Sequence, residues 1–226
     1  MVEIKAPALG SRDLFPDLQA KVYAAHAAIG PPSTPVMTAV SEVMTSYARL
    51  GVDAVVDSVS AREDLKRRLG ALFGGAPEGF AFTQNTSMGV LAIAHCFPWQ
   101  RGDEIVLFEG EFPTNITPWL EAARRHDLRI HWLSGDLFRR DPEQAIAAFH
   151  DVLRQNPIRL VAVSAVAFQT GFQMPLATLA GGCHAEGAEI FVDAIQATGV
   201  VPLDFDVLEV DYVAAGGHKW LMGPEG

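Results

Sequence analysis

Short hydrophobic runs and longer amphipathic stretches alternate along most of the chain. Several of the short runs are apolar at successive positions, as expected for parallel strands that helices cover on both faces. The amphipathic stretches between them have the periodicity of helices. Such alternation predicts an α/β fold, with a mostly parallel sheet, helices on both faces and right-handed crossovers. The expected strands are 80–83, 104–109, 129–133, 158–166, 189–194 and 211–215, and the expected helices between them are 87–97, 116–126, 142–155 and 176–187, with an irregular connection over 195–210.

The first eighty residues follow a different pattern. Residues 1–35 are mixed and end in the proline-rich stretch Ala28–Pro35, which favours extended chain. Helical patterns then cover Val36–Leu50 and Ala61–Phe73. We therefore predict an extended or helical N-terminal segment over 1–35, followed by one large domain over 36–226.

The composition of the chain argues against several classes of binding partner. The chain has 226 residues, 49% of them hydrophobic, and a net charge of −10 without a basic block, so nucleic acid is not expected to bind. No apolar run is long enough to span a bilayer, and the N-terminus lacks the apolar core of a signal peptide. Cys96 and Cys183 lie far apart and form no metal-binding pattern, so we expect two buried thiols, no metal site and a cytoplasmic location.

Polar residues follow several of the expected strands, and ligands of such sheets bind beyond the carboxyl ends of the strands. Thr86 and Ser87 come at the start of an expected helix, where unpaired N–H groups and hydroxyls can hold a phosphate. The alternative is that these hydroxyls only cap the helix. Neither a Walker A motif nor a dinucleotide-binding glycine motif is present, which argues against a nucleotide-binding domain.

Asp193 and Lys219 are the charged residues at the next strand ends. Asp193 ends the apolar run EIFVD, where a buried carboxylate requires a cation or a strong hydrogen-bond donor. It could instead cap the following turn or pair with an arginine. Lys219 follows two glycines after the last strand and could reach a central cleft, although a solvated surface lysine would have the same sequence.

Four motifs in order carry a family resemblance. From about Gly30 to the end, the segments FTQNTS, EFPTNITPW, VSAVAFQTGF and VDAIQ followed by GGHKWLMGPEG resemble the class V aminotransferase family of enzymes that depend on pyridoxal 5′-phosphate (PLP). The family includes cysteine desulfurases, selenocysteine lyases and isopenicillin N epimerase-like proteins. The resemblance implies the large domain of the three-layer PLP-transferase fold, called fold type I.

The resemblance also implies a role for each site residue. Lys219 is expected to form a Schiff base with PLP and then to act as the general base at the substrate Cα. Asp193 would pair with the protonated pyridine nitrogen, and Gln196 would hydrogen-bond the phenolic oxygen of the ring. The remaining positions implied for the cofactor are Thr86, Ser87 and His218 at the phosphate and Phe112 against the ring.

Three positions depart from the desulfurase pattern. Phe112 stands where desulfurases carry a histidine, and although it can stack on a ring it cannot transfer protons. Gly216 replaces a serine whose hydroxyl would reach the phosphate, and Phe168 replaces an asparagine. These differences argue against a desulfurase.

The reaction itself stays open. The expected function is a PLP-dependent enzyme of the class V type acting on an amino acid, with epimerase or lyase chemistry, or a truncated protein without catalysis, as alternatives. The family carries its substrate-binding arginine in a C-terminal domain, and a strand after the lysine inserts into the sheet beside the first strand. We therefore expect the 226 residues to be a fragment of a chain that forms a homodimer when complete.

Overall fold

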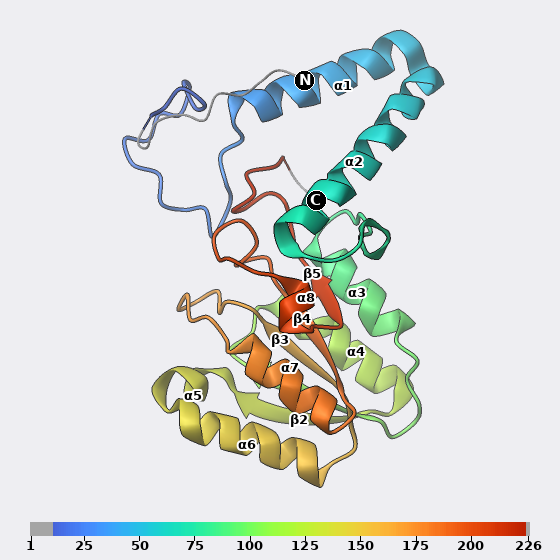
Figure 1. Cartoon of the computed structure of the whole chain (residues 1–226), viewed down its shortest axis with the longest axis vertical. Coiled ribbons are helices and arrows are strands. Elements are labelled where there is room, and N and C mark those ends of the chain that lie inside the picture. Colours follow the sequence, from blue (N-terminus) through green and yellow to red (C-terminus); the bar gives the residue numbers. More distant parts are fainter. Residues whose placement is uncertain (1–10, 225–226) are drawn as a thin grey trace.

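The computed structural model describes residues 11–224 and contains a five-stranded parallel sheet with helices on both faces (Figure 1). The strands lie in the order β2-β1-β3-β4-β5. Their bounds are β1 (Glu104–Glu109), β2 (Arg129–Ser134), β3 (Ile158–Ser164), β4 (Glu189–Asp193) and β5 (Tyr212–Ala214). The helices are α1 (Thr34–Leu50), α2 (Val55–Phe73), α3 (Thr86–Cys96), α4 (Thr117–His126), α5 (Gly135–Arg140), α6 (Pro142–Gln155), α7 (Leu176–Ala185) and α8 (Phe205–Leu208), with short 3-10 turns η1 (Gly51–Ala54), η2 (Pro77–Gly79) and η3 (Pro113–Asn115).

The alternation of side chains along each strand explains the three layers. In β1, Val106 and Phe108 belong to the apolar cluster under α5, α6 and α7. Ile105 and Leu107, which point the other way, belong to the cluster under α3 and α4. Because successive strand residues face opposite sides, a run that is apolar throughout can bury both faces at once. The predicted α/β architecture, with its parallel sheet covered on two sides, is thus confirmed.

One predicted strand is wrong, and several bounds differ. Residues 80–83 form no strand in the described part of the chain, and Phe82 is 47% exposed. A strand exists only where a neighbour accepts its backbone hydrogen bonds, and the ladder partners of β5 all lie in β4. Helix α2 begins at Val55 rather than at residue 61, and α5 and α8 are short helices that the hydrophobic pattern did not indicate.

The strand order changes direction between β1 and β3. From β1 the chain crosses to β2 through α4 on one face, whereas α6 and α7 lead to β3 and β4 on the other face. The loops that follow β1 and β3 therefore leave the sheet toward opposite faces. Ligands of open α/β sheets bind in the crevice that opens at such a switch point.

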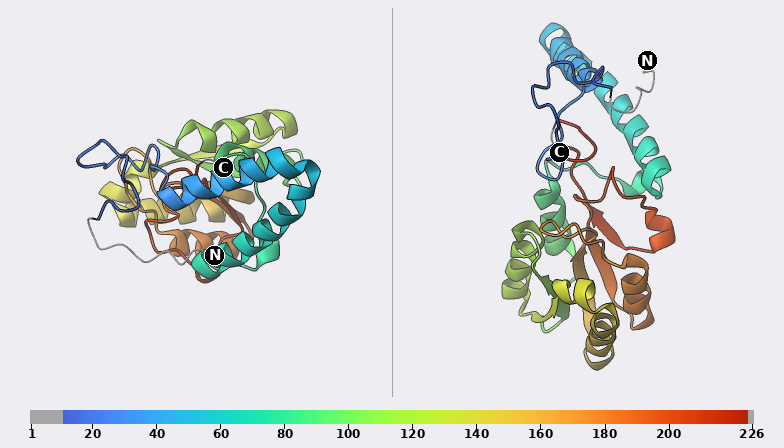
Figure 2. Two further views of the ribbon diagram at one scale, coloured as in Figure 1. Left: turned by 90° about the horizontal axis from the view of Figure 1, so that it is seen from above. Right: turned by 90° about the vertical axis from the view of Figure 1, so that its left-hand side faces the viewer.

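Helices α1 and α2 form an arm that extends away from the sheet (Figures 1 and 2). Helix α1 has no buried residue, although Met37, Val43 and Met44 are apolar. Before this arm, the chain passes beside the loop that follows β5, where the N–H of Gly30 donates to the carbonyl of His218 at 2.7 Å. Between residues 11 and 224, no helix has both the length and the hydrophobicity needed to cross a membrane.

Candidate active site at the strand ends

Asp193 lies at the carboxyl end of β4, between the ends of two neighbouring strands. It is in register with Ser164 of β3 on one side and with Ala214 of β5 on the other. Its side chain is 3% exposed, and its Oδ1 accepts a hydrogen bond from the N–H of Ile195 at 3.0 Å. Burial raises the pKa of Asp193 to about 6, opposed by the Ile195 hydrogen bond. Such a carboxylate is suited to bind a cation that arrives with a ligand.

Lys219 lies in the loop that follows β5, partly buried and within electrostatic reach of Asp193. Burial lowers the pKa of the Lys219 amine, and the negative charge of Asp193 acts in the opposite direction. A lowered pKa increases the fraction of neutral amine, which is the nucleophilic form. The structure thus places the Lys219 amine within electrostatic reach of the buried Asp193 carboxylate.

The start of α3 forms a small polar cradle with the loop after β5. Helix α3 is capped by Asn85, whose Oδ1 accepts from the N–H of Met88 at 3.0 Å, so Thr86 is not needed as the cap. The Thr86 Oγ1 and the His218 Nδ1 are both buried and have no hydrogen-bond partner among the described residues. A Cβ built on Gly216 would stand 2.9 Å from the Thr86 Oγ1 and 3.1 Å from the His218 ring.

This cradle has the properties of an anion site. Two buried polar side-chain atoms flank Gly216, which has no side chain of its own, and one of them belongs to the first turn of α3, where backbone N–H groups lack helical partners. Leaving such groups unsatisfied costs about 1–3 kcal/mol each, so a ligand that bonds to them gains affinity. Gly216 therefore belongs to the geometry of the cradle, because a side chain at this position would contact both Thr86 and His218.

Ser87 and Phe112 contact the neighbouring loops. The Ser87 Oγ lies 2.9 Å from the Oγ1 of Thr114, which follows β1. Phe112, 48% exposed, packs edge-on against Phe168 with the ring centroids 5.2 Å apart. About half of Phe112 is thus open beside the strand ends, where a planar ligand can contact it.

Gln196 connects the lysine loop to the N-terminal segment. Its Nε2 donates to the carbonyl of Ala27 at 2.9 Å, and its Oε1 accepts from the indole N–H of Trp220 at 3.0 Å. The Trp220 ring stacks on His26 at 5.6 Å between centroids. Sequence reasoning did not link residues 23–30 to the site, because no local pattern shows which distant loop a segment will contact.

Glu111 and Thr114 are polar site residues that sequence reasoning missed. Both stand in the segment EGEFPTN directly after β1, and that position was the available signal. The Glu111 Oε1 accepts from the backbone N–H of Ser164 at 2.7 Å, and its Oε2 accepts from the Ser164 hydroxyl. Burial raises the pKa of Glu111, and the hydrogen bonds from Ser164 oppose that rise.

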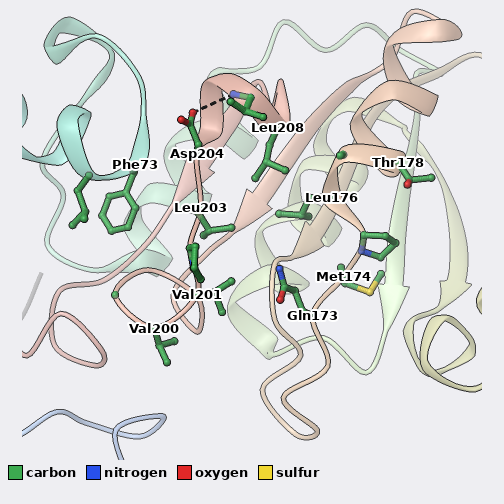
Figure 3. A pocket seen from close by; sticks show the side chains of 16 residues that line it. Phe73, Gln173, Met174, Leu176, Thr178, Val200, Val201, Leu203, Asp204 and Leu208 are labelled. Atoms are coloured by element: carbon green, nitrogen blue, oxygen red, sulfur yellow. Dashed lines mark hydrogen bonds between the residues drawn. The ribbon is translucent and has the colours of Figure 1, made fainter. Parts of the chain in front are cut away.

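An open groove of about 900 Å³ lies apart from these residues, between the end of α2 and the start of α7 (Figure 3). Its lining is mostly aliphatic, and the Asp204 carboxylate within it is already engaged with the N–H of Val207. The groove therefore offers little polar chemistry, and the reactive groups are gathered at the strand ends instead.

The two cysteines lie in different environments. Cys183 is buried, and burial raises the pKa of its thiol to about 12. Cys96 is exposed, so the prediction of a core thiol there is wrong. Ala94 faces the sheet, and Cys96, two residues later, is turned by about 200° around α3. Within residues 11–224, no group of three acidic, histidine or cysteine side chains could hold a metal ion.

Comparison with known proteins places this arrangement in a family. The sequence profile described as "Aminotransferase class-V" matches residues 22–226. Isopenicillin N epimerase of Streptomyces clavuligerus is 33% identical over 167 residues, which cover 74% of this chain and 40% of the epimerase. A probable cysteine desulfurase of Pyrococcus abyssi (strain GE5 / Orsay) is 30% identical over 224 residues, covering 94% and 53% of the two chains.

A solved structure is similar over nearly the whole chain. It is a C-DES mutant with glycine covalently linked to the PLP cofactor, and it superposes with a TM-score of 0.85 at 27% identity. The match covers 95% of this chain and 57% of that one. The chain thus spans roughly half the length of the relatives that it matches.

Proposed function

The chain belongs to the aminotransferase class-V family, and on that premise we propose that its strand-end site binds PLP in an enzyme acting on an amino acid. The observation that carries the proposal is the pair of buried, unpartnered polar atoms around Gly216, three residues before Lys219. An anion in that cradle would bring the rest of a small ligand toward the lysine. PLP is such a ligand, since it combines a phosphate with a carbonyl that reacts with amines.

The remaining residues fit the other parts of PLP. The buried Asp193 carboxylate would receive the protonated pyridine nitrogen, which supplies the cation that its burial requires. Phe112 would offer its exposed face to the ring. One hydrogen of the Gln196 Nε2 is donated to the carbonyl oxygen of Ala27. Gln196 would donate the other hydrogen to the phenolic oxygen of the cofactor.

When bound, the cofactor would supply an electron sink for the charge that develops at the substrate Cα. Asp193 would sustain that property by keeping a proton on the pyridine nitrogen. Lys219 would hold the cofactor through its Nζ and, once released by a substrate amine, would accept the Cα proton with that same atom. Its lowered pKa favours the neutral amine required for both tasks.

The outcome of the reaction depends on groups beyond these. Transamination, epimerisation and loss of a side-chain group would all begin with removal of the Cα proton, which Lys219 would accept, so the residues described here are common to all three outcomes. We assign the class V aminotransferase type, with an amino acid as substrate. A homodimer is part of the proposal, and the apolar residues exposed on α1 support it. A cytoplasmic location is also part of the proposal.

Titration with PLP tests the proposal. Wild-type protein should develop the absorbance of PLP joined to a lysine and saturate at one equivalent per chain, and a Lys219→Ala variant should not. Because the cradle recognises phosphate, pyridoxal should bind at least about tenfold more weakly than PLP. A wild-type protein that gives no saturable band, or that binds pyridoxal as tightly as PLP, would refute the assignment of this site.

A further inference from the structure

Glu111 makes an unusual contact at the switch point of the sheet. Its two carboxylate oxygens bind both polar groups of Ser164, the backbone N–H at 2.7 Å and the hydroxyl. Ser164 is the last residue of β3 and is only 9% exposed. A carboxylate that accepts two such hydrogen bonds from one residue is fixed in both position and orientation.

The contact between Glu111 and Ser164 joins the chain after β1 to the end of β3, beyond the last ladder pair of the two strands. The β1–β3 ladder ends at the pair Leu107 and Ala162, and beyond it the chain after β1 turns away. Gly110, in the left-handed region with φ 84°, makes that turn possible. The Glu111 side chain then satisfies the N–H of Ser164, so that one side chain connects the diverging loops.

The arrangement has an electrostatic cost. Burial raises the pKa of Glu111, and its negative charge also contributes to the raised pKa of Asp193 at the end of β4. Lys219 is the positive group that acts on Asp193 from the other side. Glu111 follows β1 and Asp193 ends β4, with β3 between them. The two buried carboxylates nevertheless disfavour each other's ionised forms, so packing alone does not account for the choice of a glutamate.

The segment that this contact fixes carries two groups of the site. Phe112 follows Glu111 directly and presents its ring beside Phe168. Thr114 lies two residues further on and meets Ser87 at the start of α3, with 2.9 Å between the hydroxyl oxygens. Both would move if the chain after β1 shifted relative to β3.

We propose that Glu111 is a positioning residue of the cofactor site, whose double hydrogen bond to Ser164 ties the loop after β1 to the end of β3 and thereby sets where Phe112 and Thr114 stand. This inference rests on the proposed function. Glu111 is not assigned a contact with the cofactor, and it acts through the loop that it holds. A glutamine can replace it in this role, since the amide oxygen accepts from the N–H and the amide nitrogen donates to the hydroxyl.

The test compares four single variants and one double variant in PLP titrations, with the visible circular dichroism of the bound cofactor as a report of ring orientation. Glu111→Ala should weaken PLP binding by about tenfold or more and reduce the dichroism, since it leaves the Ser164 N–H unsatisfied and the loop untied. Glu111→Gln should stay within about threefold of wild type, because it keeps both hydrogen bonds. Glu109→Gln, a change of an exposed carboxylate at the end of β1, is the matched control and should have no effect.

Ser164→Ala separates the two bonds of the contact. It removes the hydroxyl and keeps the N–H, so its loss of affinity should fall between wild type and Glu111→Ala. Adding Ser164→Ala to Glu111→Ala should cause no further loss, because the partner is already absent. Far-UV dichroism and thermal unfolding establish that each variant is folded, and if Glu111→Ala is not, Glu111→Gln and Ser164→Ala decide the question.

Two results would overturn the inference while leaving the cofactor proposal intact. One is Glu111→Ala binding PLP with wild-type affinity and dichroism, which would mean that the loop keeps its place without the contact. The other is Glu111→Gln behaving as poorly as the alanine variant, which would assign the effect to charge. Failure of wild-type protein to bind PLP at all would instead refute the proposed function, and this inference with it.

Discussion

The Thr86 hydroxyl and the His218 ring flank the same backbone position, Gly216, and neither has a partner for its buried polar atom among the described residues. They come from segments far apart in the sequence, one from the start of α3 and the other from the loop after β5. A folded protein leaves few buried polar atoms unpaired, and those that it leaves often serve a ligand. The first two predictions follow from this relationship.

Replacing Thr86 with valine should separate stability from binding. Valine has nearly the same shape but no hydroxyl, so the apo protein should gain about 1 kcal/mol because an unsatisfied buried group is removed. PLP binding should weaken at the same time, by about tenfold. Urea unfolding of the apo protein and PLP titration measure the two effects. An apo protein made less stable by valine would show that the hydroxyl already has a structural role.

Replacing Gly216 with alanine should fill the cradle. The new Cβ would stand 2.9 Å from the Thr86 Oγ1 and 3.1 Å from the His218 ring, so both groups must move. We expect PLP affinity to fall by about tenfold or more, while the protein stays folded. Gly181→Ala in α7 is the matched control, since its Cβ would meet nothing within 4 Å. That variant should gain about 0.4–1 kcal/mol and bind PLP normally.

Asp193 should give the apo protein a characteristic pH dependence. Its pKa is about 6 in the folded protein against an ordinary value of 3.8, so the native state keeps a proton that the unfolded state loses. The stability that this proton provides is present at low pH and is lost as the pH rises from about 4 through 6, by roughly 3 kcal/mol.

Asp193→Asn removes that titration and keeps an oxygen for the N–H of Ile195. The variant should therefore lose less stability than wild type between about pH 4 and pH 7, as measured by urea unfolding at each pH. Glu111 contributes a trend of the same sign in both proteins, and the difference between the two curves reports Asp193 together with its interaction with Glu111. Parallel stability curves for the two proteins would contradict the raised pKa.

Gly30 should prove necessary for the position of the lysine loop. A Cβ on Gly30 would lie 2.1 Å from the carbonyl oxygen of Lys219, so Gly30→Ala must displace one of the two segments. We expect a loss of about 1–3 kcal/mol in stability and at least tenfold weaker PLP binding. Gly79→Ala, whose Cβ would meet nothing within 4 Å, is the control. Unchanged PLP binding by Gly30→Ala would show that the N-terminal segment does not support the site.

The sequence was informative wherever a local pattern determines local structure. Runs such as 160–163 are apolar at every position, which marks strands buried on both faces, and five of the six predicted strands formed. Asn85 is a further local signal, because asparagine is among the residues most favoured as a helix N-cap. With Asn85 as the cap, the Thr86 hydroxyl is free for another role.

Local sequence patterns could not predict structural features that depend on residues far away in the sequence. Residues 80–83 look like a strand, yet a strand needs a neighbour that the run itself does not specify. Glu111 looks like an ordinary polar loop residue until the fold brings Ser164 to it, 53 positions further along the chain. The contact between Gln196 and Ala27, which lie 169 positions apart, was equally invisible in the sequence.

The central claim is that Lys219 anchors the cofactor, and borohydride reduction tests it most directly. Protein saturated with PLP is reduced, digested and mapped by mass spectrometry. Lys66 of α2, a partly buried lysine that pairs with Glu63, is the internal comparison. The account predicts one cofactor per chain on the peptide that contains Lys219, and no stoichiometric labelling of Lys66. Labelling spread over surface lysines, or a chain in which Lys219 stays unmodified, would contradict it.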